Sequence, residues 1–191
     1  MAIRLYLYLF IFISISISQD MKINKIDQTH LIKYFSFIGP YEKGTEFKPL
    51  IDDLNVNGFT NDLEYTFHKQ TKNIKHISSY AGASVHFIHQ LYDGLKEDDI
   101  VIGVAKLFSS KKQNVVLQFA EYFSTIEVFI NGVKIDLKKQ TNLLPRAKVD
   151  KGENILVVKI KNLTKAGFYI HVHNENRVEV FGKVTDKKNN S

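Results

Sequence analysis

Residues 125–137 read Thr-Ile-Glu-Val-Phe-Ile-Asn-Gly-Val-Lys-Ile-Asp-Leu. Two runs with strand character flank Asn131-Gly132. Asn-Gly is the strongest short signal for a hairpin, because both central residues of a type I′ turn need a positive φ. We therefore predict a β-hairpin with strands over 125–130 and 133–137.

The rest of the chain carries the same kind of pattern at close, regular intervals. Further strands are predicted at residues 31–38, 84–91, 100–108, 114–119, 154–161, 167–172 and 177–184. Gly39-Pro40 is expected to end the first of them, and Asp93-Gly94 and Lys151-Gly152-Glu153 mark turns. No segment after residue 20 shows a convincing helical period. Together with a short strand near 64–68, this spacing predicts an all-β fold, a jelly-roll type β-sandwich of about 8–10 antiparallel strands.

One stretch, residues 41–75, fits this pattern poorly. Glycines and prolines are scattered there among aspartates and asparagines, and we expect a long loop with one short strand near Glu64–His68. A loop of that length inside a compact domain is usually functional, or else it hides an element that the pattern does not show.

The N-terminus has the features of a secretory signal. Arg4 precedes a thirteen-residue apolar run over 5–17, and Ser16 and Ser18 are the small residues that a signal peptidase reads. The run is shorter than the ~20 residues that a membrane-spanning helix needs. We expect a signal peptide over 1–18, one β-sandwich domain over 19–184 and a polar tail over 185–191. The mature protein is predicted to be secreted or periplasmic/extracellular, with no transmembrane segment.

The composition excludes disulfides and a lipoprotein anchor, and it bears on whether the chain binds nucleic acid. The chain has no cysteine, which excludes disulfides and the acylated cysteine of a lipoprotein. Its net charge of +6 comes mostly from scattered lysines, whereas nucleic-acid binders usually gather basic residues on one face. We therefore expect no nucleic-acid partner, while attraction to an acidic polysaccharide stays open because charge acts at a distance.

Metal and catalytic signals are weak. His171 and His173 are two apart on a predicted strand and so share one face, but no third ligand is fixed beside them. His86 and His89 are three apart and should face opposite ways. Acidic loop residues without ordered spacing are admissible ligands for a structural calcium, namely Asp52, Asp53, Asp98 and Asp99. The metal and the oligomeric state stay open, and we predict no other cofactor.

No catalytic motif points to an enzyme. A Gly-x-Ser-x-Gly elbow, a phosphate-binding loop and a cysteine nucleophile are all missing. The acidic residues of Asp52-Asp53 and of Glu97-Asp98-Asp99 are adjacent in sequence, whereas a glycosidase needs two carboxyl groups that face each other, usually from different elements. The chain is predicted to be non-catalytic.

If the chain binds a small ligand, the irregular stretch over 41–75 is the expected place. Tyr41, Tyr65 and Phe67 could stack on a sugar, and polar side chains nearby could bind its hydroxyls, namely Asp52, Asp53, Asn55, Asn57 and Asn61. The other interpretation is that these residues cover a sheet edge and prevent pairing with another chain.

Four motifs occur in the order seen in a known family. They are Phe37-Ile38-Gly39-Pro40-Tyr41, Val104-Ala105, Phe129-Ile130-Asn131-Gly132-Val133 and the run from Lys151 to Lys159 (KGENILVVK). In this order they resemble the galactose-binding-like β-sandwich, an accessory module of exported bacterial proteins that is carried beside glycoside hydrolases, sulfatases and peptidases. The family often has Trp where this chain has Phe129.

The resemblance implies a non-catalytic binding module with carbohydrate as its ligand. The missing tryptophans weaken the inference of a flat aromatic platform for a sugar, but not the inference of the fold. The alternative function is a structural or protein-interaction sandwich with no small-molecule ligand.

Overall fold

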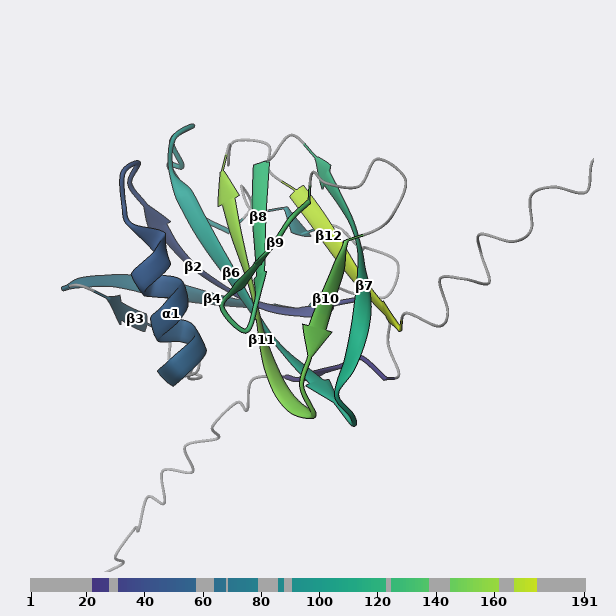
Figure 1. The fold of residues 1–191 in the computed structure, drawn as a ribbon. Helices are drawn as coiled ribbons and strands as arrows, with labels where there is room; N and C mark the ends of the chain where they lie inside the picture. Colours follow the sequence, from purple (N-terminus) through teal and green to yellow (C-terminus); the bar gives the residue numbers. More distant parts are fainter. Residues whose placement is uncertain are drawn as a thin grey trace, which may run out of the picture.

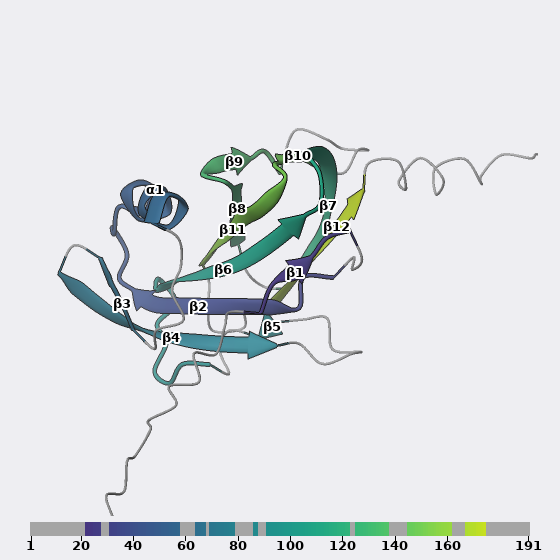
Figure 2. The same ribbon diagram turned by 90° about the horizontal axis from the view of Figure 1, so that it is seen from below.

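A computed structural model of the chain describes residues 22–27, 31–57, 64–67, 69–78, 86–87, 91–122, 125–137, 145–161 and 167–174. Within these ranges the chain forms two β-sheets that pack face to face, with one helix on the outside of the larger sheet (Figures 1 and 2). Among the described residues, no helix is long and apolar enough to cross a membrane.

The larger sheet has eight strands. Seven of them form an antiparallel path in the order β3 (Glu64–Phe67), β4 (Gln70–Ser78), β2 (Tyr34–Tyr41), β6 (Ile100–Ser109), β11 (Gly152–Lys161), β8 (Thr125–Ile130) and β9 (Val133–Ile135). The eighth, β1 (Asn24–Lys25), pairs in parallel with the end of β6. The centre of this sheet is therefore β6 between β2 and β11.

The smaller sheet has four strands, in the order β10 (Arg146–Val149), β7 (Gln113–Tyr122), β12 (Gly167–Asn174) and β5 (His86–Phe87). From β6 onward the chain crosses to the other sheet at every connection except the β8–β9 hairpin. The predicted all-β sandwich is confirmed. The described residues contain twelve strands, more than the predicted 8–10, because the structure adds β1, β4 and β10.

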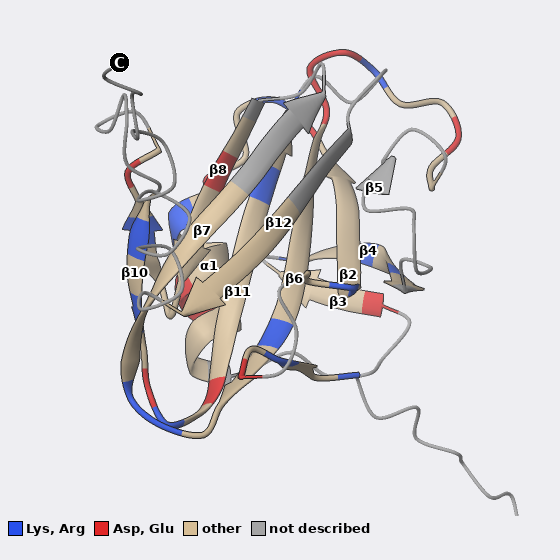
Figure 3. Cartoon of the chain, turned by 90° about the vertical axis from the view of Figure 1, so that its right-hand side faces the viewer, with Lys and Arg blue, Asp and Glu red and all other residues tan. Residues whose placement is uncertain are grey.

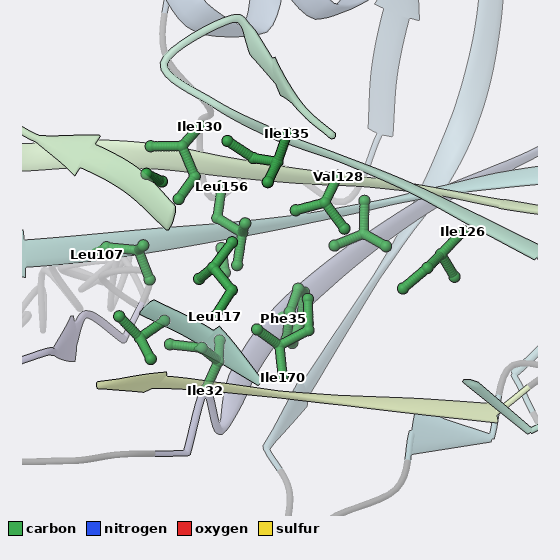
Figure 4. Packing of buried hydrophobic residues seen from close by; sticks show 14 of the residues in the cluster. Ile32, Phe35, Leu107, Leu117, Ile126, Val128, Ile130, Ile135, Leu156 and Ile170 are labelled. Carbon is green, nitrogen blue, oxygen red and sulfur yellow. The ribbon is translucent and has the colours of Figure 1, made fainter. Parts of the chain in front are cut away.

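The space between the two sheets is filled with aliphatic side chains together with Phe35 and Phe37, and Figure 4 shows part of this cluster. Alternation along the strands supplies them: on β8, Ile126, Val128 and Ile130 point inward, and on β11, Leu156 and Val158 do so. Burying one such side chain contributes roughly 1.5–3 kcal/mol. The same alternation sends the intervening residues of β8 and β11 to the outer face of the larger sheet.

A second buried cluster lies on that outer face, beneath helix α1 (Phe47–Asn57). Phe47, Leu50, Ile51 and Leu54 are all buried and follow the i, i+3, i+4, i+7 spacing of an amphipathic helix. The expectation of a long loop over 41–75 is therefore wrong, because α1 and β4 occupy much of it, while the short strand expected near Glu64–His68 is confirmed as β3. Pro49 fits α1 because it lies in the first turn, where a missing N–H breaks no helical hydrogen bond.

Two of the predicted turns are confirmed, and one predicted strand end is wrong. Asn131 and Gly132 have φ of 50° and 76°, so the β8–β9 hairpin and its turn are confirmed. Gly94 has φ of 69° in the turn after Asp93. Gly39-Pro40, however, does not end its strand: β2 runs on to Tyr41, and its pairing with β6 shifts in register between Ile38 and Tyr41. A local irregularity thus accommodates a residue that cannot donate to the ladder.

Some predictions fall outside the described residues. These are the signal peptide over 1–18, the strand over 177–184 and the tail over 185–191. The predicted strand over 84–91 is described only at β5. The boundaries of the domain at 19 and 184 therefore stay predictions.

Candidate functional site

A groove of about 440 Å³ lies between α1 and the outer face of the larger sheet. The helix forms one wall, and β8, β11 and the β8–β9 hairpin form the other. Its lining consists of Phe47, Lys48, Ile51, Asp52, Glu127, Phe129, Gly132, Lys134 and Lys159. Of these nine residues, five are charged, while Phe47, Ile51 and Phe129 give the groove a largely apolar surface between the charges.

Strand register brings the polar residues of the sheet wall together. Ile126, Val128 and Ile130 face the core, so Glu127 and Phe129 face the helix. On β11, Lys159 lies directly opposite Glu127, and on β9, Lys134 lies directly opposite Phe129. Side chains opposite one another on antiparallel strands are close enough to interact.

Glu127 is the centre of a cluster of three lysines. Its Oε2 accepts a hydrogen bond of 2.6 Å from Lys134 Nζ, and its Oε1 lies 3.3 Å from Lys161 Nζ and 3.5 Å from Lys159 Nζ. The hydrogen bond from Lys134, aided by the charges of Lys159 and Lys134, lowers the pKa of Glu127 to about 2, although burial opposes the shift. The carboxylate is therefore ionised at neutral pH.

Two of these ammonium groups lie over aromatic rings. Lys159 Nζ is 4.4 Å from the centre of the Phe47 ring, and Lys134 Nζ is 5.9 Å from the centre of the Phe129 ring. The side chain of Lys159 is only 15% exposed. Burial lowers its pKa, an effect that Glu127 opposes and Lys161 reinforces. The sheet wall thus holds a largely buried lysine, Lys159, against Phe47 of the helix and an exposed lysine, Lys134, near Phe129.

The helix wall carries a more exposed pair. Lys48 Nζ and Asp52 Oδ2 are 2.8 Å apart, one turn apart on α1. Further along the helix, the side chain of Asn55 lies against Gly132 of the hairpin. Any side chain added at Gly132 would contact it, since the Cβ would be 3.5 Å from Asn55 Nδ2. The groove is therefore bounded at the hairpin end by Asn55 and Gly132.

The structure separates the five residues predicted to bind a ligand. Asp52 lines the groove and Asn55 lies at its end. Tyr65 is half-buried, and its hydroxyl donates a hydrogen bond to Asp53 Oδ2. Tyr41 is only 1% exposed.

Tyr41 therefore cannot stack on a sugar, and its assignment to an open surface is wrong. Its ring packs edge-on against Phe47, with centroids 5.7 Å apart, because α1 covers the end of β2. Burial also raises the pKa of Tyr41 to about 12. Burial and the hydrogen bond to Asp53 raise the pKa of Tyr65 as well.

The other aromatic and metal candidates can be placed only in part. Phe67 packs against the cluster beneath α1. Asp98 pairs with Lys43 at 3.1 Å, and Asp99 Oδ2 accepts a hydrogen bond from the Lys96 backbone N–H. Asn61 and His89, and the side chains of Asn57 and His86, lie outside the described part.

His171 and His173 share one face of β12 as predicted, with rings stacked 5.8 Å apart. His173 Nε2 is 3.1 Å from Gln118 Oε1. Within the described ranges, no three His, Asp or Glu side chains come together in a way that could hold a metal ion. The structural calcium therefore gains no candidate site among these residues.

Sequence reasoning missed most of the groove. The apolar spacing of Phe47, Leu50, Ile51 and Leu54 could have revealed α1. No sequence signal, by contrast, places Lys159 beside Glu127. That contact depends on β11 lying between β6 and β8.

Basic and acidic positions are otherwise spread over the strands and loops of the described chain (Figure 3). The groove is distinguished by the convergence of Asp52, Glu127, Lys134 and Lys159 on its lining.

Comparison with known proteins gives no family for this chain. No family model and no curated protein sequence matches it. Among solved structures, a β-glucosidase from Kluyveromyces marxianus is similar at a TM-score of 0.38 and 12% identity, over 84% of this chain and 20% of that enzyme. The chain is a mostly-β sandwich with distant structural similarity to part of that β-glucosidase.

Proposed function

We propose that this chain is an exported, non-catalytic binding module that takes a short segment of carbohydrate in the groove between α1 and the β8–β9–β11 wall. The observation that supports the proposal is the convergence of Asp52, Glu127, Lys134 and Lys159 on one groove of about 440 Å³. Sugars present hydroxyls that both donate and accept hydrogen bonds, and this set offers both kinds of partner. The groove is of a volume usual for small-ligand sites.

The two carboxylates favour binding over hydrolysis. A glycosidase needs one carboxyl group with a raised pKa, so that it can donate a proton to the leaving oxygen. Glu127 has the opposite character, since its lysine partners lower its pKa to about 2. Asp52 is engaged by Lys48 on the exposed side of α1. Glu127 is therefore not suited to act as the acid.

The affinity is expected to be weak. The groove is open to solvent along the helix, and Lys134 and Glu127 must exchange part of their mutual hydrogen bonding for contacts to the ligand. Dissociation constants on the order of 10 μM to 1 mM, or about 4–7 kcal/mol, follow from a few hydrogen bonds in such a wet site.

Calorimetry with a panel of soluble glycans tests the proposal, using the chain from Gln19 onward. Lys134→Ala and Asp52→Ala, which remove one donor and one acceptor from opposite walls, should each weaken binding. Lys148→Ala, on exposed β10 of the other sheet, is the matched control and should not. An absence of heat with every glycan would refute the carbohydrate function.

A second function, a protein-interaction sandwich without a small-molecule ligand, is favoured by two exposed apolar side chains. Val56 is 79% and Val133 is 66% exposed, and each follows one member of the Asn55–Gly132 contact. A second copy of the chain is one partner that could bury both valines in a two-fold interface. Sedimentation that shows association, lost in the Val56→Ser/Val133→Ser variant, would support this function in place of glycan binding.

A further inference from the structure

We infer that the groove selects an acidic carbohydrate, whose carboxylate or sulfate group is held by Lys134 and Lys159. This inference rests on the proposed function and specifies its ligand class. It depends on three observations on the sheet wall: the charge of the lysine cluster, the partial desolvation of Lys159, and the occupation of both ring faces.

The cluster has more positive than negative charge. Lys134, Lys159 and Lys161 surround the single carboxylate of Glu127 at 2.6–3.5 Å. On the facing helix, Lys48 and Asp52 neutralise each other. The sheet wall therefore has two positive charges in excess, and the opposite wall does not compensate for them.

Unused hydrogen-bond donors accompany this charge. An ammonium group has three N–H bonds, while Lys159 and Lys161 share one oxygen of Glu127 and Lys134 takes the other. Lys159 is the most buried of the three, and burial together with the neighbouring lysines lowers its pKa. An anion beside a cation that water solvates poorly gains more than one beside an exposed lysine.

The aromatic rings favour charge over stacking. Neutral sugars are commonly held by an open aromatic face, but Phe47 is buried with Lys159 over its ring, and the ammonium of Lys134 lies near the ring of Phe129. The contact with Phe47 holds Lys159 at the groove, and the hydrogen bond to Glu127 holds Lys134 there, so that a ligand can reach both ammonium groups. A neutral sugar would have to displace a lysine to stack, whereas an acidic sugar would bind to it.

Glu127 provides a way to separate ligand binding from a purely structural role. If the cluster only stabilises the sheet, Glu127→Gln should weaken folding and leave ligand affinity unchanged. If the groove binds an anion, the same variant removes the internal carboxylate that competes for the lysines. Affinity for an acidic glycan should then rise at least threefold.

The central experiment compares an oligomer of 1,4-linked galacturonic acid with its methyl ester, which keeps the sugar and removes the charge. A sulfated galactose oligomer and its desulfated form make a second pair, and the two pairs distinguish carboxylate from sulfate. By calorimetry in 50 mM salt, at least one acidic form should bind tenfold or more tightly than its neutral partner. The difference should shrink in 500 mM salt, which screens charge.

Variants locate the effect. Lys134→Gln and Lys159→Met should each lower affinity for the acidic oligomer about tenfold, to that of the neutral form. Met retains the apolar stem that packs on Phe47. Lys148→Gln changes the net charge equally but lies on β10 of the other sheet, and it should alter affinity less than twofold.

Each outcome decides a different claim. Equal affinity for the acidic and neutral forms would overturn the inference and leave the proposed function standing. Equal weakening by Lys148→Gln and Lys134→Gln would also overturn it, because bulk charge would then explain the binding. Binding of no glycan at all would refute the proposed function and this inference together.

Discussion

The side-chain amide of Asn131 donates a hydrogen bond of 2.7 Å to the side-chain oxygen of Asn154. This contact joins the β8–β9 hairpin to the start of β11. Asn131 also accepts a hydrogen bond from the Ile155 backbone N–H at 2.9 Å. Asn154 is buried, and its oxygen accepts a second hydrogen bond, from the Asp150 N–H. One asparagine pair thus fixes two turns at the hairpin end of the groove.

Replacing Asn154 should therefore destabilise the fold more than its size suggests. Asn154→Ala leaves the Asp150 N–H and the Asn131 amide without their acceptor in a buried place. We expect a loss of about 1–3 kcal/mol in the free energy of unfolding, measured by urea denaturation. Asn73→Ala, at an exposed position of β4, is the control and should change stability by less than about 0.5 kcal/mol.

The turn itself gives a second prediction. Gly132 has φ of 76°, and a β-branched side chain is strained there. Gly132→Val should lower the free energy of unfolding by roughly 1–3 kcal/mol. Gly132→Asn should lower it less, because Asn tolerates the left-handed region. Unchanged thermal unfolding of the Val variant would contradict a tight turn at this position.

The lysine cluster makes stability depend on pH. The folded-state pKa of Glu127, about 2, lies below its ordinary value of 4.5, so ionised Glu127 stabilises the fold at higher pH. This contribution is complete above about pH 5 and is lost as the pH falls towards 2. Glu127→Gln should cost roughly 1–2 kcal/mol at pH 7, less than the full shift implies because solvent screens the lysines.

Urea denaturation of both proteins from pH 7 to pH 2 would test this prediction. The difference between wild type and Glu127→Gln should narrow steadily below about pH 5. A difference that stays constant over this range would mean that the three lysines do not hold Glu127 in the folded protein.

Tyr41 is predicted to act through packing alone. Its hydroxyl is buried and has no hydrogen-bond partner among the described residues. Tyr41→Phe should leave the free energy of unfolding unchanged or raise it by up to about 1 kcal/mol, and should not affect glycan binding. Tyr41→Ala should destabilise by about 3–5 kcal/mol, because it leaves a cavity beneath α1. A loss of glycan affinity in the stable Phe variant would contradict this role.

Export is a separate prediction that rests on the sequence. We expect the mature chain to begin at or near Gln19, because the apolar run over 5–17 is too short to remain as an anchor. N-terminal sequencing of material secreted by cells that express the full chain would check it. Secreted protein that still begins at Met1 would be the contrary result.

The sequence predicted those elements whose signals are local. The β8–β9 hairpin was predictable because the Asn131-Gly132 pair is strongly preferred in tight hairpin turns, and β6 and β11 were predictable from their apolar runs. Helix α1 was missed because Asp52, Asp53 and Asn55 are typical of loops, although its four buried apolar residues are spaced as in a helix. Here tertiary packing outweighs intrinsic propensity.

The groove illustrates a harder limit. Asp52 and Asn55 were among the predicted ligand residues because they are polar, and the structure places them at the groove. Glu127, Lys134 and Lys159 were not predicted. Their proximity follows from the order of strands in the sheet, and alternation along a single strand specifies only which face a side chain takes.

The central position of β6 in the larger sheet also affects how the chain folds. Val101 of β6 pairs with Ile160 of β11. In the chain, β7, β8, β9 and β10 lie between these two strands, so β6 cannot pair with β11 until all of them have been synthesised. Pairing between such distant segments is slow, typically milliseconds to seconds, because the chain loses the entropy of closing a long loop before the stabilising contacts form. Until β6 pairs with β11, its unpaired apolar edge can pair with another chain and cause aggregation. Late closure of this kind would suit the predicted export, because a chain whose central strands have not yet paired can still be threaded across a membrane.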